Sequence, residues 1–378
     1  MRLSMILVLL LLVVLLGVTV LGIYVIFSWE KPLGPALNLP TYTAPSNSGS
    51  IDTTQMALPQ DGQSKSTLQP LTTPQPVSPE GTALPASTLI PAAQPLCGGP
   101  EVMTILLVGS DARSTGYLYG LADSIHVMRI DFTVPNVMVV DFPRDLWVEI
   151  PGISDHYGIT HGKINQAYLY GNPGMGYYDG SGEGPGLLAE TLDFNFGMRA
   201  DHYIAVDRQT FVKMIDAVGG VDVNMKSPVD LNSKHGTPDP RMVLQAGMNH
   251  LDGEMALRLA SNRVPTTFQR MKYEKLILSA LREKLLTPAM LPKLPGLVAN
   301  FIGSVQTDLS PSEINSLICI AQAVPKDNIM ADSFPRDMFK AEVTYDENRE
   351  VTTYIDVVDN AALRALVAEF MHGIWPMP

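Results

Sequence analysis

Three apolar runs stand close together in the first part of the folded chain and predict a small sheet. Residues 103–109 (MTILLVG), 124–132 (SIHVMRIDF) and 137–142 (VMVVDF) have the length and the β-branched content of strands. A turn at residues 133–136 joins the last two runs. Short connections favour pairing between consecutive strands. The pattern therefore predicts a three-stranded antiparallel meander.

Beyond this meander, apolar positions recur with helical and with strand periods. They have helical spacing in residues 187–194, 209–218, 251–259 and 270–286, and they alternate as in strands in residues 202–206 and 221–225. Ser310 is followed by a proline and by Glu313, as at the start of a capped helix. The glycine-rich residues 168–186 predict a surface loop or lid. Strands mixed with helices indicate an α/β layered domain.

The start of the chain has the pattern of a membrane anchor followed by a linker. Residues 3–27 are almost wholly apolar, which is long enough for a helix across a bilayer, and no cleavage site follows them. Residues 31–100 are rich in Pro, Ser, Thr and Gln with hardly any charge, which predicts a disordered linker. We therefore expect a single-pass signal anchor (1–30), this linker, and a domain (101–378) held outside the cytoplasm at the cell membrane.

The composition permits a large core and argues against nucleic-acid binding. Of the 378 residues, 46% are hydrophobic, and the formal net charge is −12. Binding to a phosphate backbone needs a basic face, which this balance disfavours. Two cysteines, Cys97 and Cys319, are too few to define a disulfide framework. A single disulfide is the alternative, but the sequence favours two unpaired thiols.

Charged residues flank the predicted strands at the ends that an antiparallel meander brings together. Asp111 follows the first strand, Asp123 precedes the second, and Arg144 and Asp145 follow the third. Two carboxylates and an arginine can bind a divalent metal ion and a phosphate. The alternative is that the aspartates cap turns and that Arg144 and Asp145 form a surface ion pair. The pattern favours magnesium-dependent chemistry on a phosphate.

An ordered series of short motifs resembles a known family. The motifs are LVGSD (107–111) with Arg113, DS (123–124), FPRD (142–145), KIN (163–165), HY (202–203), DAVGGV (216–221), LDG (251–253) and TDLS (307–310). None is specific alone. Their order and spacing after an apolar N-terminus are similar to those of the LytR-CpsA-Psr family of envelope proteins, from about residue 103 to residue 329.

This resemblance implies a fold, an activity and partners. The family fold is a mixed central β-sheet flanked by helices in an α-β-α arrangement. Members resemble magnesium-dependent phosphotransferases that move a glycopolymer from a polyprenyl-pyrophosphate carrier to peptidoglycan, and pyrophosphatase activity is a further expectation. They hold the pyrophosphate with arginines and the lipid in a hydrophobic tunnel. The transcriptional role once attached to the family name fits poorly with an acidic chain that carries an anchor.

The resemblance also assigns roles to residues of this chain. Asp111 and Asp123 match the metal-binding acids, and the metal expected is magnesium. The catalytic arginines that it implies are Arg113, Arg144, Arg263 and Arg270. Substrate binding is expected from Lys163, Arg144 and Arg263. Lys163 could equally be a solvated cation, and the general base is not identifiable from the sequence, although Asp145 is a candidate.

Several family positions are changed, which makes this chain a divergent member. An arginine expected before the second metal acid is Leu121 here, and the first arginine of a later R-x-R pair is Ser261. An aspartate, an arginine and a glutamine around Arg270 are replaced by Thr267, Tyr273 and Glu274. Fewer arginines and an added carboxylate would weaken pyrophosphate binding. The second hypothesis is therefore a non-catalytic binder of prenyl phosphates or wall glycans.

Overall fold

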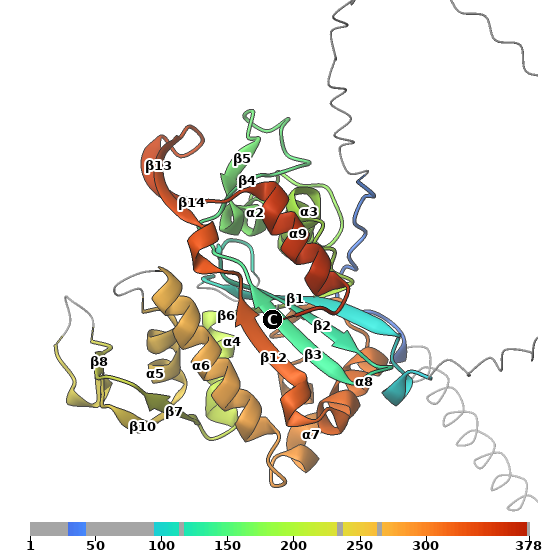
Figure 1. Cartoon of the computed structure of the whole chain (residues 1–378), viewed down its shortest axis with the longest axis vertical. Coiled ribbons are helices and arrows are strands. Elements are labelled where there is room, and N and C mark those ends of the chain that lie inside the picture. Colours follow the sequence, from blue (N-terminus) through green and yellow to red (C-terminus); the bar gives the residue numbers. More distant parts are fainter. Residues whose placement is uncertain (1–28, 43–93, 113–116, 233–236, 263–266, 376–378) are drawn as a thin grey trace, which may run out of the picture. The chain divides into compact units, whose positions relative to one another are not determined.

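A six-stranded sheet lies at the centre of the part of the chain that the structure describes. The computed structural model describes residues 29–42, 94–112, 117–232, 237–262 and 267–375, and its sheet has the order β11-β6-β1-β2-β3-β12 (Figure 1). The bounds are β1 Val102–Ser110, β2 Ala122–Asp131, β3 Asn136–Asp141, β6 His202–Asp207, β11 Gln306–Thr307 and β12 Ile329–Ser333. The antiparallel pairing of β1 with β2 and of β2 with β3 confirms the predicted meander. Because β6 is parallel to β1 and β12 is parallel to β3, the sheet is mixed, as the resemblance implied.

Helices cover both faces of this sheet because successive strand residues are apolar on alternate sides. Leu106 and Val108 of β1 pack in one core with residues of α2 (Ile164–Gly171), α3 (Glu183–Phe196) and α9 (Asn360–Met371). Met103 and Ile105 belong to a second core, which includes Ile320 of α8 (Pro311–Ala323). Figure 1 shows α2, α3 and α9 on one side of the sheet and α4, α6, α7 and α8 on the other. The expected layers of helix, sheet and helix are therefore present.

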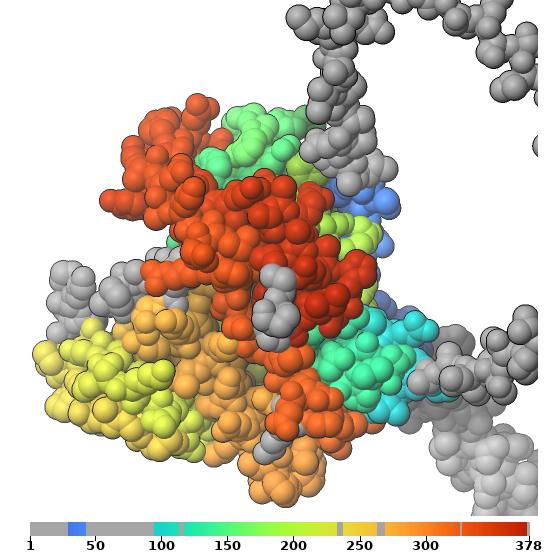
Figure 2. Space-filling model, viewed as in Figure 1, coloured from blue at the N-terminus to red at the C-terminus, as the bar shows by residue number. Residues whose placement is uncertain are grey.

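A smaller lobe beside the sheet has a core of its own. Its elements are α4 (Arg208–Ala217), β7 (Val221–Met225), β10 (Gly247–Leu251), α5 (Gly253–Ala260) and α6 (Thr267–Leu285). Helix α7 (Leu294–Phe301) connects this lobe to α8. Three short ribbons complete the described fold: β4 (Trp147–Glu149) with β5 (His161–Lys163), β8 (Val229–Asp230) with β9 (Val243–Leu244), and β13 (Lys340–Asp346) with β14 (Val351–Val357). The β13–β14 ribbon projects from the surface in Figure 2.

The predicted loop over residues 168–186 is wrong at both of its ends. Helix α2 extends to Gly171 and α3 begins at Glu183, so only residues 172–182 are irregular. The glycines permit close contact between the two helices. A Cβ atom on Gly184 would lie 2.5 Å from Asn172 Oδ1 and 2.8 Å from the carbonyl oxygen of Tyr168. A glycine-rich composition therefore marked a tight helix contact as well as a loop.

Cys97 and Cys319 form a disulfide, so the expectation of two unpaired thiols is wrong. Cys97 lies in the short 3-10 helix η1 (Leu96–Gly98), and Cys319 lies in α8. The packing of η1 on α8 brings their Cα atoms to 5.7 Å, within the usual range for a disulfide. Their separation of 222 residues leaves no local sequence signal of this contact.

Residues 31–41 fall in the range predicted as a linker, and they lie against the domain. Leu37 and Leu39 pack on the core that contains α2 and α3. Arg199 donates hydrogen bonds to the carbonyl oxygens of Leu39 and Pro40 at 2.9 and 3.0 Å. The predicted anchor falls on residues 1–28, outside the described residues. Within the described ranges, every helix is too short or too polar to cross a bilayer.

Candidate functional site at one end of the central sheet

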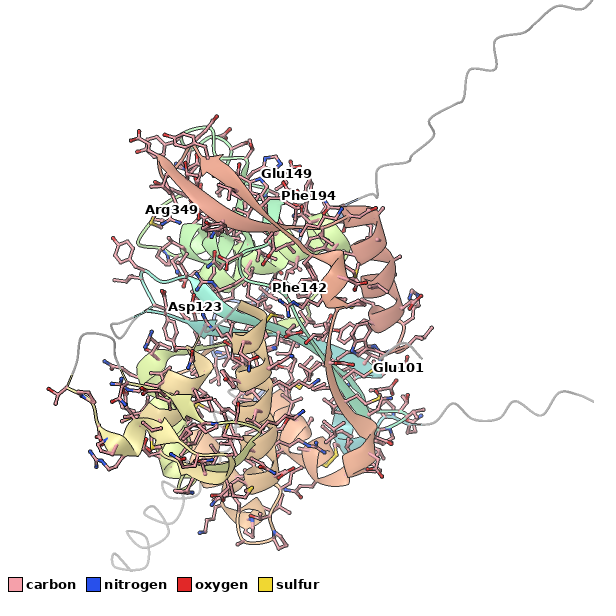
Figure 3. All side chains as sticks on the ribbon, turned by 60° about the vertical axis from the view of Figure 1, so that its left-hand side comes forward. Glu101, Asp123, Phe142, Glu149, Phe194 and Arg349 are labelled. Atoms are coloured by element: carbon pink, nitrogen blue, oxygen red, sulfur yellow. A yellow bond between two sulfur atoms is a disulfide. The ribbon has the colours of Figure 1, made fainter. Side chains whose placement is uncertain are left out.

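A β-bulge places Asp123 at the end of the sheet where the meander was predicted to gather charge. Gly109 pairs with Ser124 and Ser110 pairs with Ala122, so Asp123 is the extra residue in β2. A bulge redirects a side chain away from the regular alternation. Gly109 is required here because a Cβ atom would lie 2.9 Å from the Ser124 Cβ atom. Figure 3 shows Asp123 and Glu101 at opposite ends of the sheet.

Two guanidinium groups from different elements converge on the Asp123 carboxylate. Arg144, in the turn after β3, donates from Nη1 to Asp123 Oδ1. Arg270, in the first turns of α6, donates from Nη1 to Asp123 Oδ2 at 3.2 Å. Asp111 lines the same pocket as Asp123 and Arg270, and its Oδ1 accepts a hydrogen bond from the Leu121 amide at 2.6 Å. The predicted convergence of Asp111, Asp123 and Arg144 is thus confirmed.

A second ion pair, between Lys163 and Asp145, lies beside Arg144 and is linked to the β13–β14 ribbon. Lys163 Nζ donates to Asp145 Oδ1 at 2.8 Å, and Arg144 Nε lies 3.5 Å from Asp145 Oδ2. Asp356 of β14 donates its amide to the Asp145 carbonyl oxygen at 2.9 Å. Burial raises the pKa of the Asp356 carboxyl, and the charge of Asp145 raises it further. Lys163 is therefore a buried cation paired with Asp145 and not a solvated one, and its role in substrate binding stays a prediction.

Glu274 lines the same pocket as Asp123 and contacts Arg270 and Ser124. Its Oε1 accepts a hydrogen bond from Arg270 Nε at 2.7 Å, and its Oε2 accepts one from Ser124 Oγ at 3.2 Å. His126 Nε2 lies 2.8 Å from the same Ser124 hydroxyl. Burial raises the pKa of Glu274 even though Arg270 opposes the shift, and burial lowers the pKa of His126. The Glu274 side chain thus lines the pocket, which is the position in which its carboxylate would weaken pyrophosphate binding.

These side chains border two adjoining spaces. A pocket of about 240 Å³ has a mostly aliphatic lining that also carries a group of polar side chains, for which we call it the polar pocket: Asp111, Asp123, Ser124, Arg208, Ser261, Arg270 and Glu274. An apolar cavity of about 1090 Å³ lies between the sheet and helices α6, α7 and α8. Both spaces are lined by Leu107, His126, Ile204, Val206, Met214, Leu278 and Leu281. The polar pocket and the apolar cavity therefore adjoin each other along this shared wall.

The predicted site residues fall into three groups. Asp111, Asp123 and Arg270 line the polar pocket. Arg144 and Lys163 lie beside it, and Arg144 reaches it through Asp123. Arg113 and Arg263 lie outside the described residues.

Sequence reasoning missed four polar residues of this site. Ser124 was predicted only as part of a strand and of the DS motif, and His126 only as part of a strand, yet both contact Glu274. Asp356 and Arg208 belong to elements that carry no motif of their own. A local pattern could have found Ser124 and His126, because alternate residues of one strand lie on the same face.

The donor set is compatible with a small hard cation. In the described part of the chain, no three or more His, Cys, Asp or Glu side chains are grouped so as to hold a metal ion. Magnesium needs fewer protein ligands, because it keeps several waters and binds through one or two carboxylates and phosphate oxygens. Asp111 and Asp123 both line the polar pocket, and carboxylate oxygens are ligands that magnesium prefers. These two residues therefore fit that coordination.

Two curated proteins are similar to this chain over slightly more than half of its length. The regulatory protein MsrR of Staphylococcus aureus (strain COL) is 29% identical over 216 residues, which cover 56% of this chain and 58% of MsrR. The polyisoprenyl-teichoic acid–peptidoglycan teichoic acid transferase TagU of Oceanobacillus iheyensis is 29% identical over 222 residues, which cover 58% of this chain and 62% of TagU. The match thus spans less than two thirds of the length of either relative.

Solved structures share the fold, and a family model covers most of the chain. The crystal structure of Bacillus subtilis TagV superposes with a TM-score of 0.56 at 24% identity, covering 74% of this chain and 99% of TagV. Bacillus subtilis TagT superposes with a TM-score of 0.52 at 18% identity, covering 75% and 97%. At this identity the likeness concerns the fold. The model of the LytR_cpsA_psr family matches residues 94–365. The chain therefore belongs to the LytR_cpsA_psr family.

Proposed function

We propose that this protein is a membrane-anchored, extracytoplasmic phosphotransferase that attaches a glycopolymer to the cell wall. Its donor would be the glycopolymer on a polyprenyl-pyrophosphate carrier, and its acceptor a hydroxyl of peptidoglycan. The observation that carries the proposal is that the polar pocket adjoins the apolar cavity along a shared wall. A ligand that joins a phosphate group to a long hydrocarbon needs this combination of surfaces.

The apolar cavity has the chemical character of a lipid-binding space. Its walls include Leu278, Leu281 and Leu285 of α6, together with aliphatic residues of α7, α8 and β3. At about 1090 Å³ it is at the upper end of the usual range for small-molecule sites. A hydrophobic chain placed there would be removed from water, which is favourable in proportion to the apolar area buried.

The relatives support the same substrate class. TagU bears the name of a transferase that moves teichoic acid to peptidoglycan, and one TagT structure of the same fold is bound to LIIa-WTA, with a TM-score of 0.53 and 19% identity. At described positions, this chain carries the two acids and two of the arginines to which the family resemblance assigned roles: Asp111, Asp123, Arg144 and Arg270. We propose the transferase activity for this chain because it carries those residues.

Each described residue has a role in this reaction. Asp111 and Asp123 would hold magnesium, which supplies positive charge to the phosphate oxygens when it is bound. Arg144 and Arg270 would donate hydrogen bonds to phosphate oxygens and stabilise the charge that develops on them. The acceptor oxygen forms a bond to the glycopolymer-linked phosphorus, the bond from that phosphorus to the bridging oxygen breaks, and polyprenyl monophosphate leaves. Asp145 is our candidate to accept the hydroxyl proton.

The test uses the full chain in mild detergent with a polyprenyl pyrophosphate. We expect phosphate release that depends on magnesium and that falls roughly 100-fold or more in Arg144→Ala, the usual scale for losing a donor to developing negative charge. Arg258→Ala is the matched control, because Arg258 forms an exposed ion pair with Glu254 on α5. Full magnesium-dependent activity in Asp123→Ala would disprove the metal assignment.

A second candidate function is binding of prenyl phosphates without turnover. Arg144 and Arg270 are already paired with Asp123, and Arg270 is also paired with Glu274. A phosphate ligand must compete with these carboxylates for both guanidinium groups. Saturable binding of polyprenyl pyrophosphate with no release of phosphate in the same assay would support this function over the first.

A further inference from the structure

The segment that follows the predicted membrane anchor lies along the domain in a defined path. We name residues 29–41 the strap. The Leu33 amide donates to the Leu309 carbonyl oxygen at 3.2 Å, and the Leu37 amide donates to Asp308 Oδ2 at 3.2 Å. The carbonyl oxygen of Ala36 accepts a hydrogen bond from Ser181. These contacts and the packing of Leu37 hold the strap along most of its length.

The strap also forms part of the wall of the apolar cavity. Leu33, Gly34 and Pro35 line that cavity together with residues of α7 and α8. Gly34 makes the closest approach, because a Cβ atom there would lie 2.6 Å from the Thr307 carbonyl oxygen and 3.2 Å from the Tyr203 hydroxyl. A side chain at this position would therefore push the strap off the cavity wall.

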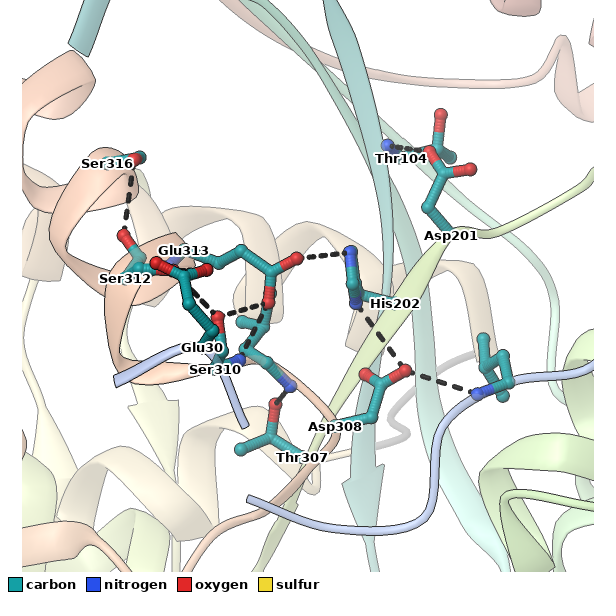
Figure 4. Close-up of polar contacts among 12 residues, drawn as sticks. Glu30, Thr104, Asp201, His202, Thr307, Asp308, Ser310, Ser312, Glu313 and Ser316 are labelled. Atoms are coloured by element: carbon teal, nitrogen blue, oxygen red, sulfur yellow. Dashed lines mark hydrogen bonds and ion pairs between the residues drawn. The ribbon is translucent and has the colours of Figure 1, made fainter. Parts of the chain in front are cut away.

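A polar network ties the same region to the start of α8 (Figure 4). Asp308, which is buried, accepts hydrogen bonds from the amides of Leu37 and Tyr203. His202 lies 3.5 Å from Asp308 Oδ2 and 3.2 Å from Glu313 Oε1, between these two acids. At the first turn of α8, Ser312 Oγ donates to Glu30 Oε2 at 3.0 Å. The strap is thus attached to the domain from its first residues onward.

Chain length limits how far the attached strap can be from the predicted anchor. The predicted span ends at Phe27, and the Leu33 amide is already bonded to the domain six residues later. Six extended residues reach at most about 20 Å. A free linker of about 70 residues would instead have an average end-to-end distance of about 45 Å. The domain must therefore lie close to the end of the predicted span.

The Pro/Ser/Thr-rich residues 43–93 do not add to the distance between the predicted membrane span and the domain. The strap before them is bonded to Arg199, and Cys97 after them is bonded to Cys319 of α8. The described residues of 29–41 and 94–375 belong to one compact unit. The segment therefore leaves and rejoins one domain, and its length has no influence on the separation of anchor and domain.

We propose that the strap holds the domain against the bilayer with the strap side of the apolar cavity next to the lipid. The partner of this surface is a lipid membrane, and the inference rests on the proposed function, whose anchor is predicted from sequence. Trp29 and Leu33 on the strap are 46% and 42% exposed, although both are large apolar side chains. Tryptophan is enriched at membrane interfaces, so this exposure suits contact with lipid headgroups. A polyprenyl tail could then enter the cavity without crossing water.

The experiment measures how close two faces of the domain lie to a bilayer. The full chain is inserted into phosphatidylcholine vesicles that carry a headgroup quencher, with a dye on Asn315→Cys or on Tyr354→Cys. Asn315 is exposed on α8 one turn beyond Ser312, and Tyr354 is 76% exposed on the β13–β14 ribbon. The native disulfide leaves the new thiol as the labelling site. We expect strong quenching at position 315 and none at position 354.

Two variants test whether the strap causes this proximity. Gly34→Ala should abolish quenching at position 315, because the added methyl group meets the backbone of Thr307. Leu37→Asp should have the same effect by removing the apolar contact with the core. Gly296→Ala on α7 is the control, because a Cβ atom there has no neighbour within 4 Å. We expect it to keep full quenching.

Flotation of the same vesicles separates the two possible failures. If the labelled chain does not float with the vesicles, the anchor of the proposed function is absent, and the strap proposal fails with it. If the chain floats but the dye at position 315 is unquenched, the strap proposal alone is overturned. Unchanged quenching at that position in both strap variants would also overturn it, since the domain would then lie near the membrane for another reason.

Discussion

The Glu274 carboxylate accepts a hydrogen bond from Arg270 Nε at 2.7 Å, one helical turn earlier on α6. Both side chains are buried, and the same guanidinium group also contacts Asp123. A cation that a phosphate ligand would use is thus shared between two acids of the protein. The charge of Glu274 therefore controls how strongly Arg270 can attract a ligand.

We predict that Glu274→Gln tightens the binding of polyprenyl pyrophosphate at pH values above the raised pKa of Glu274. Burial holds the pKa of Glu274 above its usual range, so the carboxyl ionises as the pH rises through that value and then competes for Arg270. Removing one charge-assisted competitor should increase affinity about tenfold, which corresponds to about 1.4 kcal/mol. The measurement is a binding titration with a fluorescent polyprenyl pyrophosphate at several pH values.

The ratio of the variant and wild-type affinities is the informative quantity, because ionisation of the ligand is common to both proteins. This ratio should grow as the pH rises. Glu283→Gln, at an exposed position on the same helix, should bind as the wild type does. A ratio that stays constant with pH would show that Glu274 ionisation does not compete with the ligand.

Ser261→Arg is predicted to increase both affinity and magnesium-dependent turnover. Ser261 lines the polar pocket where relatives of this family were expected to carry an arginine. A guanidinium group there would add a charge-assisted hydrogen bond to phosphate, an interaction of about 1.5–3 kcal/mol. The assay is phosphate release from polyprenyl pyrophosphate, and Ser261→Gln controls for side-chain size without charge. Equal rates in the two variants would contradict the electrostatic explanation.

Asp141 is predicted to make the protein less stable as the pH rises. Burial raises the pKa of this carboxyl to about 6, although a hydrogen bond from Ser333 opposes the shift. The folded state then binds more protons than the unfolded state between about pH 4 and pH 6. The stabilising contribution is complete below about pH 4 and is lost as the pH rises through about 6, which amounts to roughly 3 kcal/mol.

Asp141→Asn should remove this dependence and raise the free energy of unfolding at neutral pH. The measurement compares urea midpoints of the full chain at about pH 5 and about pH 8. Asp155→Asn, at an exposed position, should keep the wild-type dependence on pH. An unchanged dependence in Asp141→Asn would assign it to another group.

The disulfide between Cys97 and Cys319 is predicted to stabilise the domain by about 2–4 kcal/mol, the usual range for such a bond. It closes a long loop, so its main effect is to restrict the unfolded chain. The double variant Cys97→Ser and Cys319→Ser should unfold at lower urea concentration than the oxidised wild type. A reducing agent should lower the midpoint of the wild type and leave that of the double variant unchanged. Equal midpoints in all four samples would exclude a stabilising role.

Much of the fold was predictable because its signals are local. The three strands of the meander, the helices α4 and α6 and the cap at Ser310 follow from periodicity and from short capping motifs. The convergence of Asp111, Asp123 and Arg144 was also predictable, because antiparallel pairing of adjacent strands leaves little freedom in where their ends meet. The loop over residues 168–186 was mispredicted because glycine serves both turns and close helix contacts.

The sequence by itself determined the family, the central meander and the acids and arginine at its end, since each depends on residues near one another in the chain. Only the tertiary structure decided which partners these residues have. Arg270 meets Asp123 across 147 residues, and Cys97 meets Cys319 across 222. The attachment of Leu37 to Asp308 spans 271 residues. Contacts of this range depend on the packing of whole elements, and no local pattern of residues specifies them.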